Sequence, residues 1–150
     1  MYSRQESASI KRKFWTVFGQ YMKPIRSSSE ETVNWVNYNT GIKNIYFRLD
    51  ATRDFATVSI EITHQDPGLR QAYFKKFVQF KQLFIQVAGN KWIWDQHYTD
   101  EHGKQISRIV LRLGDRNIFN ENDWPAIISF FKPALISLDE FWTTVKEQML

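Results

Sequence analysis

The sequence contains no cysteine and only six glycines and four prolines among its 150 residues. The lack of cysteine excludes disulfides, thiolate metal ligands and cysteine nucleophiles, and it is typical of proteins from a reducing compartment. None of the six glycines belongs to a GxGxxG, GxxxxGK[ST] or GxSxG pattern. The sequence therefore gives no support to a phosphate-binding loop or a hydrolase nucleophile elbow.

Long apolar runs are also missing. The first 15 residues, MYSRQESASIKRKFW, lack the apolar core of a signal peptide, and no stretch approaches the roughly 18 apolar residues of a membrane span. We therefore expect a cytoplasmic protein with no membrane partner.

The net charge is small. Twenty lysines and arginines stand against 16 acidic residues, for a net charge of +4. This balance allows an anionic partner, but it falls short of the excess found in nucleic-acid-binding tails.

What the chain does contain is apolar and aromatic side chains. Hydrophobic residues make up 43% and aromatic residues 16% of the sequence, which is far from the composition of disordered chains. Together with the length, and with no linker or repeat, this composition predicts one folded domain over residues 1–150.

The first predicted element is a helix that begins near Arg4 and ends before Pro24. Ser3 and Glu6 have the spacing of a capping box, in which each side chain bonds the other residue's backbone N–H. The apolar face is expected to carry residues spaced three and four apart, namely Ile10, Phe14, Val17, Phe18 and Tyr21.

Three β-type runs follow, at residues 33–38, 44–50 and 55–63. Apolar and polar residues alternate in the second and third runs, so one sheet face is buried and the other is polar. With a turn at residues 51–54, the second and third strands would pair Asp50 with Phe55 and Glu61 with Asn44.

A second helix is predicted to begin after Asp66, which precedes a first-turn proline, and to run to Gly89. A hairpin of strands 92–99 and 104–113 follows, and this pairing would set Asp95 opposite Arg108.

The last predicted helix begins at Asn122 or Asp123. Pro133 interrupts its apolar pattern, so we expect a kink there or two separate helices. The predicted order is α-β-β-β-α-β-β-α, which is an α+β fold with helices packed on a mainly antiparallel sheet.

Several strings carry a family resemblance: KRKFWTVFGQYM, NWVNYNTGIKNIYFRLD, VSIEITH, ISRI and DWPAIISFFKPALISLDEFW. Over nearly its whole length the chain resembles the uncharacterised domain-of-unknown-function family 4268. The resemblance implies a bacterial, cytoplasmic protein of the Bacteroidetes type that stands alone, or the C-terminal part of a longer protein with a nuclease-like N-terminal region. It assigns no catalytic residue.

An enzyme hypothesis comes from the element order, because α-β-β-β-α-β is also the core of the PD-(D/E)xK nucleases. In the predicted register Asp50 and Glu61 lie roughly 20 Å apart, which is too far to share a metal ion. Thr63 stands where such nucleases keep a lysine. The sequence therefore favours at most a degenerate nuclease scaffold and a chain that is not an enzyme, with no catalytic residue, metal or cofactor.

The histidines add no metal site. His64, His97 and His102 do not have the spacing of known zinc or facial-triad motifs. His102 falls in a predicted turn, where a solvated side chain is the simplest interpretation.

Two groups of residues are candidates for binding. The polar sheet face would carry Arg48, Glu61, Thr63 and Arg108. An anion-binding patch on the first helix would carry Lys11, Arg12 and Lys13. Such a patch beside exposed aromatics would suit single-stranded nucleic acid, although short basic runs are more often solvated helix faces.

The preferred function is a non-catalytic binding or assembly module that contacts a protein partner or forms a homodimer. This prediction depends on aromatic side chains of the second and last helices that one small core need not enclose. They are Phe74, Phe80, Phe84, Phe130, Phe131, Phe141 and Trp142. The alternative is that both helices are central and covered on two sides.

Overall fold

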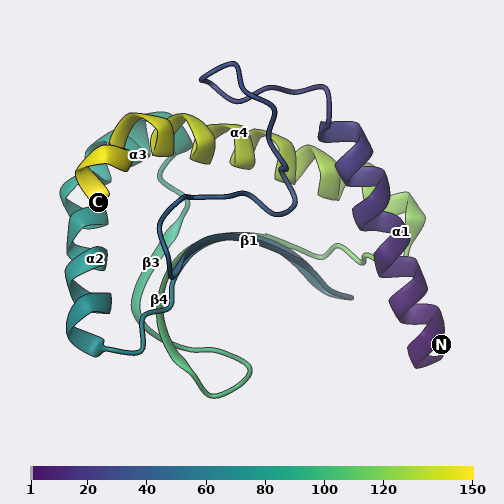
Figure 1. Ribbon diagram of the computed structural model, residues 1–150. Helices are drawn as coiled ribbons and strands as arrows, with labels where there is room; N and C mark the ends of the chain where they lie inside the picture. Colours follow the sequence, from purple (N-terminus) through teal and green to yellow (C-terminus); the bar gives the residue numbers. More distant parts are fainter. Residues whose placement is uncertain (1) are drawn as a thin grey trace.

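A computed structural model describes residues 2–150 and has the α+β architecture that the sequence predicts. The elements are α1 (Arg4–Met22), β1 (Ile45–Ala51), β2 (Phe55–Ile62), α2 (Pro67–Gln79), α3 (Lys81–Ala88), β3 (Ile93–Thr99), β4 (Gln105–Gly114), the short 3-10 helix η1 (Glu121–Asp123) and α4 (Trp124–Met149). Figure 1 shows α4 lying across a bent sheet, with α1 near one end of the sheet and α2 near the other.

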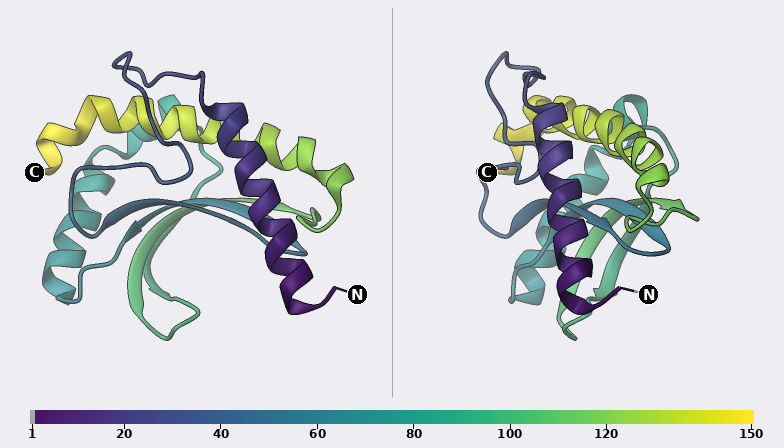
Figure 2. Two further views of the ribbon diagram at one scale, coloured as in Figure 1. Left: turned by 45° about the vertical axis from the view of Figure 1, so that its right-hand side comes forward. Right: turned by 90° about the vertical axis from the view of Figure 1, so that its right-hand side faces the viewer.

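The sheet has four antiparallel strands in the order β1-β2-β4-β3. Inward residues alternate with polar outward residues, as the β1 pairs Phe47↔Ile60 (inward) and Arg48↔Ser59 (outward) illustrate. The helices pack on the inward face (Figure 2), and the outward face curves away from them. The predicted antiparallel sheet with one polar face is therefore confirmed.

The core lies between the sheet and the helices, and aromatic rings fill much of it. Phe14, Phe18 and Phe131 are fully buried and in mutual ring contact, with centroids 5.4 to 6.3 Å apart. The buried face of α1 continues to Met22 rather than to Tyr21, which is 47% exposed. Val17 is also exposed, at 37%, so the predicted apolar stripe of this helix was rotated from the real one.

Two helices differ from the prediction in their continuity. The second predicted helix is broken at Phe80, whose backbone angles (φ −99, ψ 14) leave the helical region and whose N–H bonds Phe77 three residues back. The last helix is not divided: α4 runs through Pro133 for 26 residues. The helix arches over the sheet (Figure 1). This curvature accommodates Pro133, which has no N–H to bond the carbonyl of Ser129 and whose ring would crowd that carbonyl in a straight helix.

The predicted first strand, residues 33–38, is wrong. These residues belong to a long irregular segment between α1 and β1. The Asn34 side chain accepts the N–H of Asn37 and forms a local turn, and the Trp35 indole N–H donates to the carbonyl of Ile25. These bonds hold the apolar side chains of the segment on the core without a sheet partner.

No helix within residues 2–150 combines the length and the apolar character that crossing a membrane would require.

Candidate binding cleft on the open sheet face

The outward face of the sheet is the candidate functional surface, and its register differs by two residues from the predicted one. Asp50 pairs with Thr57 and Glu61 with Tyr46, not with Phe55 and Asn44. The reason is that β1 extends to Ala51, and Thr52 then closes a tight turn by bonding the carbonyl of Phe55 through its N–H.

Glu61 lies at the centre of this face. Its Oε1 accepts a 3.3 Å bond from Nε of Arg48, and its Oε2 accepts a 3.4 Å bond from the Ser59 hydroxyl. The Glu61 side chain is 23% exposed, so the carboxylate is reachable from solvent and is not enclosed among apolar groups.

Arg108 stands beside Glu61 on β4 and, as the sequence predicted, opposite Asp95 on β3. Among residues 2–150 no ion pair joins it to either carboxylate. Its guanidinium instead lies 3.5 Å from the ring centroid of Tyr98, and its Nε is buried without an acceptor. Stacking therefore fixes the guanidinium while part of its hydrogen-bonding capacity is unused.

The same pairing of arginine with an aromatic ring recurs on this face. Arg48 lies 4.3 Å from the ring of Tyr46, and Arg112 lies 4.8 Å from the ring of Phe55. Arginine held flat on a ring presents its fork of N–H donors in a fixed direction, which suits recognition of a planar acceptor such as a carboxylate.

Arg48, Glu61, Tyr98 and Arg108 are among the residues that line a cleft of about 680 Å³. Its floor is the outward face of β1, β2 and β4, and its walls are Lys11 from α1 and the β3–β4 turn with Asp100, Glu101 and His102. Figure 1 shows the N-terminal part of α1 and the turn of this hairpin both extending past the concave side of the sheet. We call this space the concave cleft.

The hairpin turn that forms one wall is rigidly built. The Asp100 carboxylate accepts the backbone N–H groups of His102 and Lys104 at 2.9 and 2.8 Å, and the Lys104 bond in particular lowers the pKa of Asp100. His102 lies 3.5 Å from Glu101. The predicted solvated turn histidine is therefore exposed, but it also faces the cleft.

Thr63 does not join the other predicted face residues. It follows the end of β2, is 92% buried, and bonds Asn44 through both its N–H and its hydroxyl. Arg48, Glu61 and Arg108 line the concave cleft, whereas Thr63 closes the end of the β1–β2 pair.

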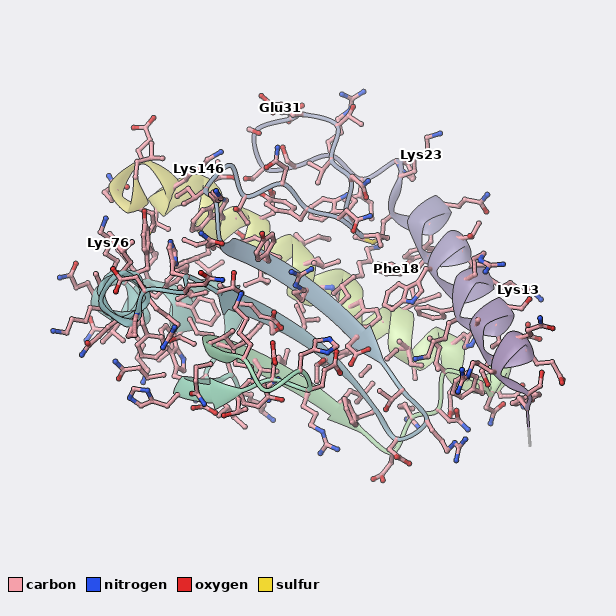
Figure 3. All side chains as sticks on the ribbon, turned by 60° about the horizontal axis from the view of Figure 1, so that its bottom comes forward. Lys13, Phe18, Lys23, Glu31, Lys76 and Lys146 are labelled. Atoms are coloured by element: carbon pink, nitrogen blue, oxygen red, sulfur yellow. The ribbon has the colours of Figure 1, made fainter. Side chains whose placement is uncertain are left out.

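The three basic residues predicted as one patch on α1 point in different directions. Lys11 lines the concave cleft, and Arg12 is exposed elsewhere on the helix. Lys13 pairs with Glu121 at 2.9 Å, near the start of α4 (Figure 3). Only Lys11 therefore adds positive charge to the site.

The charges of the outward face balance. The strand registers place Arg48, Arg108 and Arg112 on it together with Asp50, Glu61 and Asp95. The face is thus a neutral pattern of alternating charge, not an electropositive groove.

The two acids of the nuclease hypothesis are separated by four strand residues, or about 13 Å, because Asp50 is opposite Thr57. This is closer than predicted but still too far for one metal ion. Within the part of the chain that the structure describes, no group of three or more histidine, aspartate or glutamate residues is arranged to hold a metal.

Tyr98 is a cleft residue that the sequence analysis did not place on this face. Simple alternation from Asp95 would place Tyr98 on the opposite face, but a bulge between these two residues brings both to the outward side. A bulge within a plain β-type run has no clear sequence signal.

The aromatic residues that suggested an interface are largely internal. Phe84, Phe131 and Phe141 are fully buried, and Phe74 and Trp142 are at most 7% exposed. Phe80 and Phe130 are partly buried and pack against the core. These aromatics lie in the core or against it, so they do not indicate an interaction surface.

A family model described as Domain of unknown function (DUF4268) matches residues 10–146 of the chain. No curated protein and no solved structure matches the chain.

Proposed function

The chain belongs to the family described as Domain of unknown function (DUF4268), and we propose that its concave cleft is a non-catalytic binding site for an extended protein segment that carries a carboxylate. A cytoplasmic location, supported by the absence of cysteine, is part of this proposal.

The observation that carries the proposal is the state of Arg108. Its guanidinium is fixed on Tyr98, its Nε is buried without an acceptor, and its two neighbouring carboxylates form no ion pair with it. A guanidinium that is fixed on a ring and has no carboxylate partner in the chain keeps N–H donors unused, so a ligand carboxylate that accepts from its terminal nitrogens forms a charge-assisted hydrogen bond without displacing an internal partner.

Most of the other cleft charges are partnered within the chain, and Glu101 has only His102 beside it, at 3.5 Å. Arg48 bonds Glu61, and the carboxylates of Asp50 and Asp100 accept backbone N–H groups. Lys11, at the rim, makes no ion pair among the described residues. Arg108 and Lys11 are therefore the lining cations that no carboxylate of the described chain pairs, and they are the groups that would hold a ligand carboxylate beside the exposed carboxylate of Glu101.

The balance of charge favours a protein segment over nucleic acid. Nucleic-acid affinity comes mainly from neutralising many phosphates, and a face with equal numbers of arginines and carboxylates gives little of this energy. Tyrosine and arginine are instead the residues enriched at the energetic centres of protein interfaces. A cleft of about 680 Å³ accommodates a few residues of an extended chain.

The test is selection of short random peptides on the wild-type protein, followed by fluorescence anisotropy with the selected sequences. We expect acidic residues to be enriched, and we expect Arg108→Gln to weaken binding about tenfold or more. Arg12→Gln is the matched control because it removes an exposed arginine outside the cleft, and binding should not change.

Other outcomes would overturn the proposal. Failure to select any peptide would remove the protein-segment ligand. Salt-sensitive binding of a single strand or duplex that depends on Arg108 would assign the cleft to nucleic acid, and Mg²⁺-dependent cleavage would restore the nuclease hypothesis. A concentration-dependent mass that Arg108→Gln abolishes would make the occupant a second copy of this chain.

A further inference from the structure

A second cavity lies on the other side of the sheet, away from the concave cleft. It has a volume of about 450 Å³ and lies between the irregular segment at residues 27–39 and the C-terminal half of α4. Figure 3 shows Glu31 in that segment and Lys146 on α4, which are both lining residues. This volume is in the range of small-molecule sites.

Asp139 of α4 forms part of the cavity wall, although it is 98% buried. Its Oδ1 accepts the hydroxyl of Tyr38 at 2.6 Å, and its Oδ2 accepts the backbone N–H of Ser28 at 2.8 Å. None of the ion pairs within residues 2–150 includes Asp139. Buried carboxylates are normally compensated by a positive charge, and here none of the described side chains provides it.

The remaining charges of the cavity have the same sign. Glu31 and Glu147 also line it, against the single cation Lys146, and no ion pair links Lys146 to any of these carboxylates. The cavity therefore carries a net negative charge, which attracts a cation.

Aromatic rings complete the lining. Tyr38 and Trp142 both face the cavity, and their polar atoms are already used because the Trp142 indole N–H donates to the carbonyl of Thr40. The half-buried ring of Tyr38 is the aromatic surface that a positive group could contact, whereas the ring of Trp142 is buried against Phe77. The side chains of Asn34, Asn37 and Thr143 add neutral hydrogen-bonding groups.

The geometry points to a binding site for a small organic cation that carries a protonated primary amine and neutral hydroxyl groups. The ammonium group bonds the carboxylate of Asp139 beside the ring of Tyr38, and the hydroxyl groups bond the side-chain amides of Asn34 and Asn37. This site is independent of the concave cleft and does not depend on the function proposed for that cleft.

Glucosamine and glucose are the matched probes, because they share a ring and most hydroxyl groups and differ in the charged amine. Binding is followed by two-dimensional NMR of the full chain, with the indole N–H of Trp142 and the amides of Asn34 and Asn37 as reporters. We expect saturable shifts at these groups with glucosamine at concentrations up to about 10 mM, and no shifts with glucose.

Variants locate the binding. Asp139→Asn should weaken glucosamine binding by about tenfold or more, because it removes the charge that the ammonium contacts. The double variant with Glu31→Gln and Glu147→Gln leaves the hydrogen bonds of Asp139 to Tyr38 and Ser28 intact, and it should weaken binding about two- to fivefold, as expected for exposed ion pairs. Glu140→Gln is the control: it removes an exposed charge next to Asp139 on α4 that does not line the cavity.

Three results would overturn the inference. They are equal shifts with glucose and glucosamine, no shift at the reporter groups with either sugar, and an equal loss of binding in Glu140→Gln and in the double variant. Because the double variant does not touch the buried bonds of Asp139, the inference can be tested even if Asp139→Asn does not fold.

Discussion

The hydroxyl of Tyr38 donates a 2.6 Å hydrogen bond to Oδ1 of Asp139, which lies 101 positions further along the chain. The other oxygen of the same carboxylate accepts the N–H of Ser28. One buried side chain of α4 therefore holds two points of the irregular segment between α1 and β1. This contact positions the segment over the helix and shapes the cavity between them.

Replacement of Tyr38 by phenylalanine should destabilise the fold by about 1–3 kcal/mol, because Oδ1 of Asp139 would be buried without its donor. Burial and the bond to Asp139 raise the pKa of Tyr38 far above its usual value, so the hydroxyl keeps its proton. Urea unfolding measures the change. Tyr46→Phe, at an exposed tyrosine, should stay within about 0.5 kcal/mol of wild type. Equal effects at both positions would contradict the anchoring role.

Gly41 should resist replacement by alanine because its φ of +78 is strained for any residue with a Cβ. That Cβ would also lie 2.5 Å from Nζ of Lys146, but the end of this flexible side chain can move aside at little cost. Gly103 has the same φ and open space around it, so Gly41→Ala and Gly103→Ala should each cost about 1 kcal/mol in thermal unfolding. A clearly larger loss for Gly41→Ala that shortening Lys146 to alanine recovers would show instead that Lys146 is held in place.

Stability should fall as the pH drops below about 6.5, the usual pKa of histidine, because His64 titrates at a lower pH in the fold. Burial, followed by the charge of Arg70, lowers the pKa of His64. As the pH falls, His64 therefore binds a proton in the unfolded chain before it does so in the folded chain. The stability contributed by neutral His64 is fully present above pH 6.5 and is lost as the pH falls from there to the lower pKa of the folded state. Urea midpoints across this range measure the slope. The dependence of the urea midpoint on pH should become weaker in His64→Gln and remain in His102→Gln, which changes an exposed turn residue.

Local signals predicted much of this fold. The capping box of Ser3 and Glu6 and the cap at Asp66 mark helix starts in the structure as they do in the sequence. The hairpin pairing of Asp95 with Arg108 also followed from turn position and alternation. Each of these features depends on residues close together in the chain, which is why a single sequence sufficed.

The features that failed depend on distant residues. The run at residues 33–38 has strand-like composition, but Tyr38 bonds α4 and Trp35 bonds Ile25, just after α1, instead of a neighbouring strand. Asp139 falls within a helical pattern, and nothing nearby indicates that Tyr38 and Ser28 bury it. Alternation placed Arg48, Glu61 and Arg108 on the same face, but Thr63 lies off it, and Tyr98 joins it because a bulge changes which side of β3 this residue occupies.

Pro133→Ala should stabilise the chain by about 1–3 kcal/mol, because α4 runs through this proline without a helical N–H at that position. Alanine restores a bond to the carbonyl of Ser129, and the proline side chain is exposed, so little packing is lost. Pro125 is the matched control. It lies in the first turn of the same helix, where no intrahelical N–H partner exists and the fixed φ of proline is favourable, so Pro125→Ala should not stabilise the fold. Urea unfolding of the two variants separates these effects. Equal changes would mean that the arch of α4 has already removed the cost of Pro133, and that the curvature is set by packing on the sheet instead of by the missing bond.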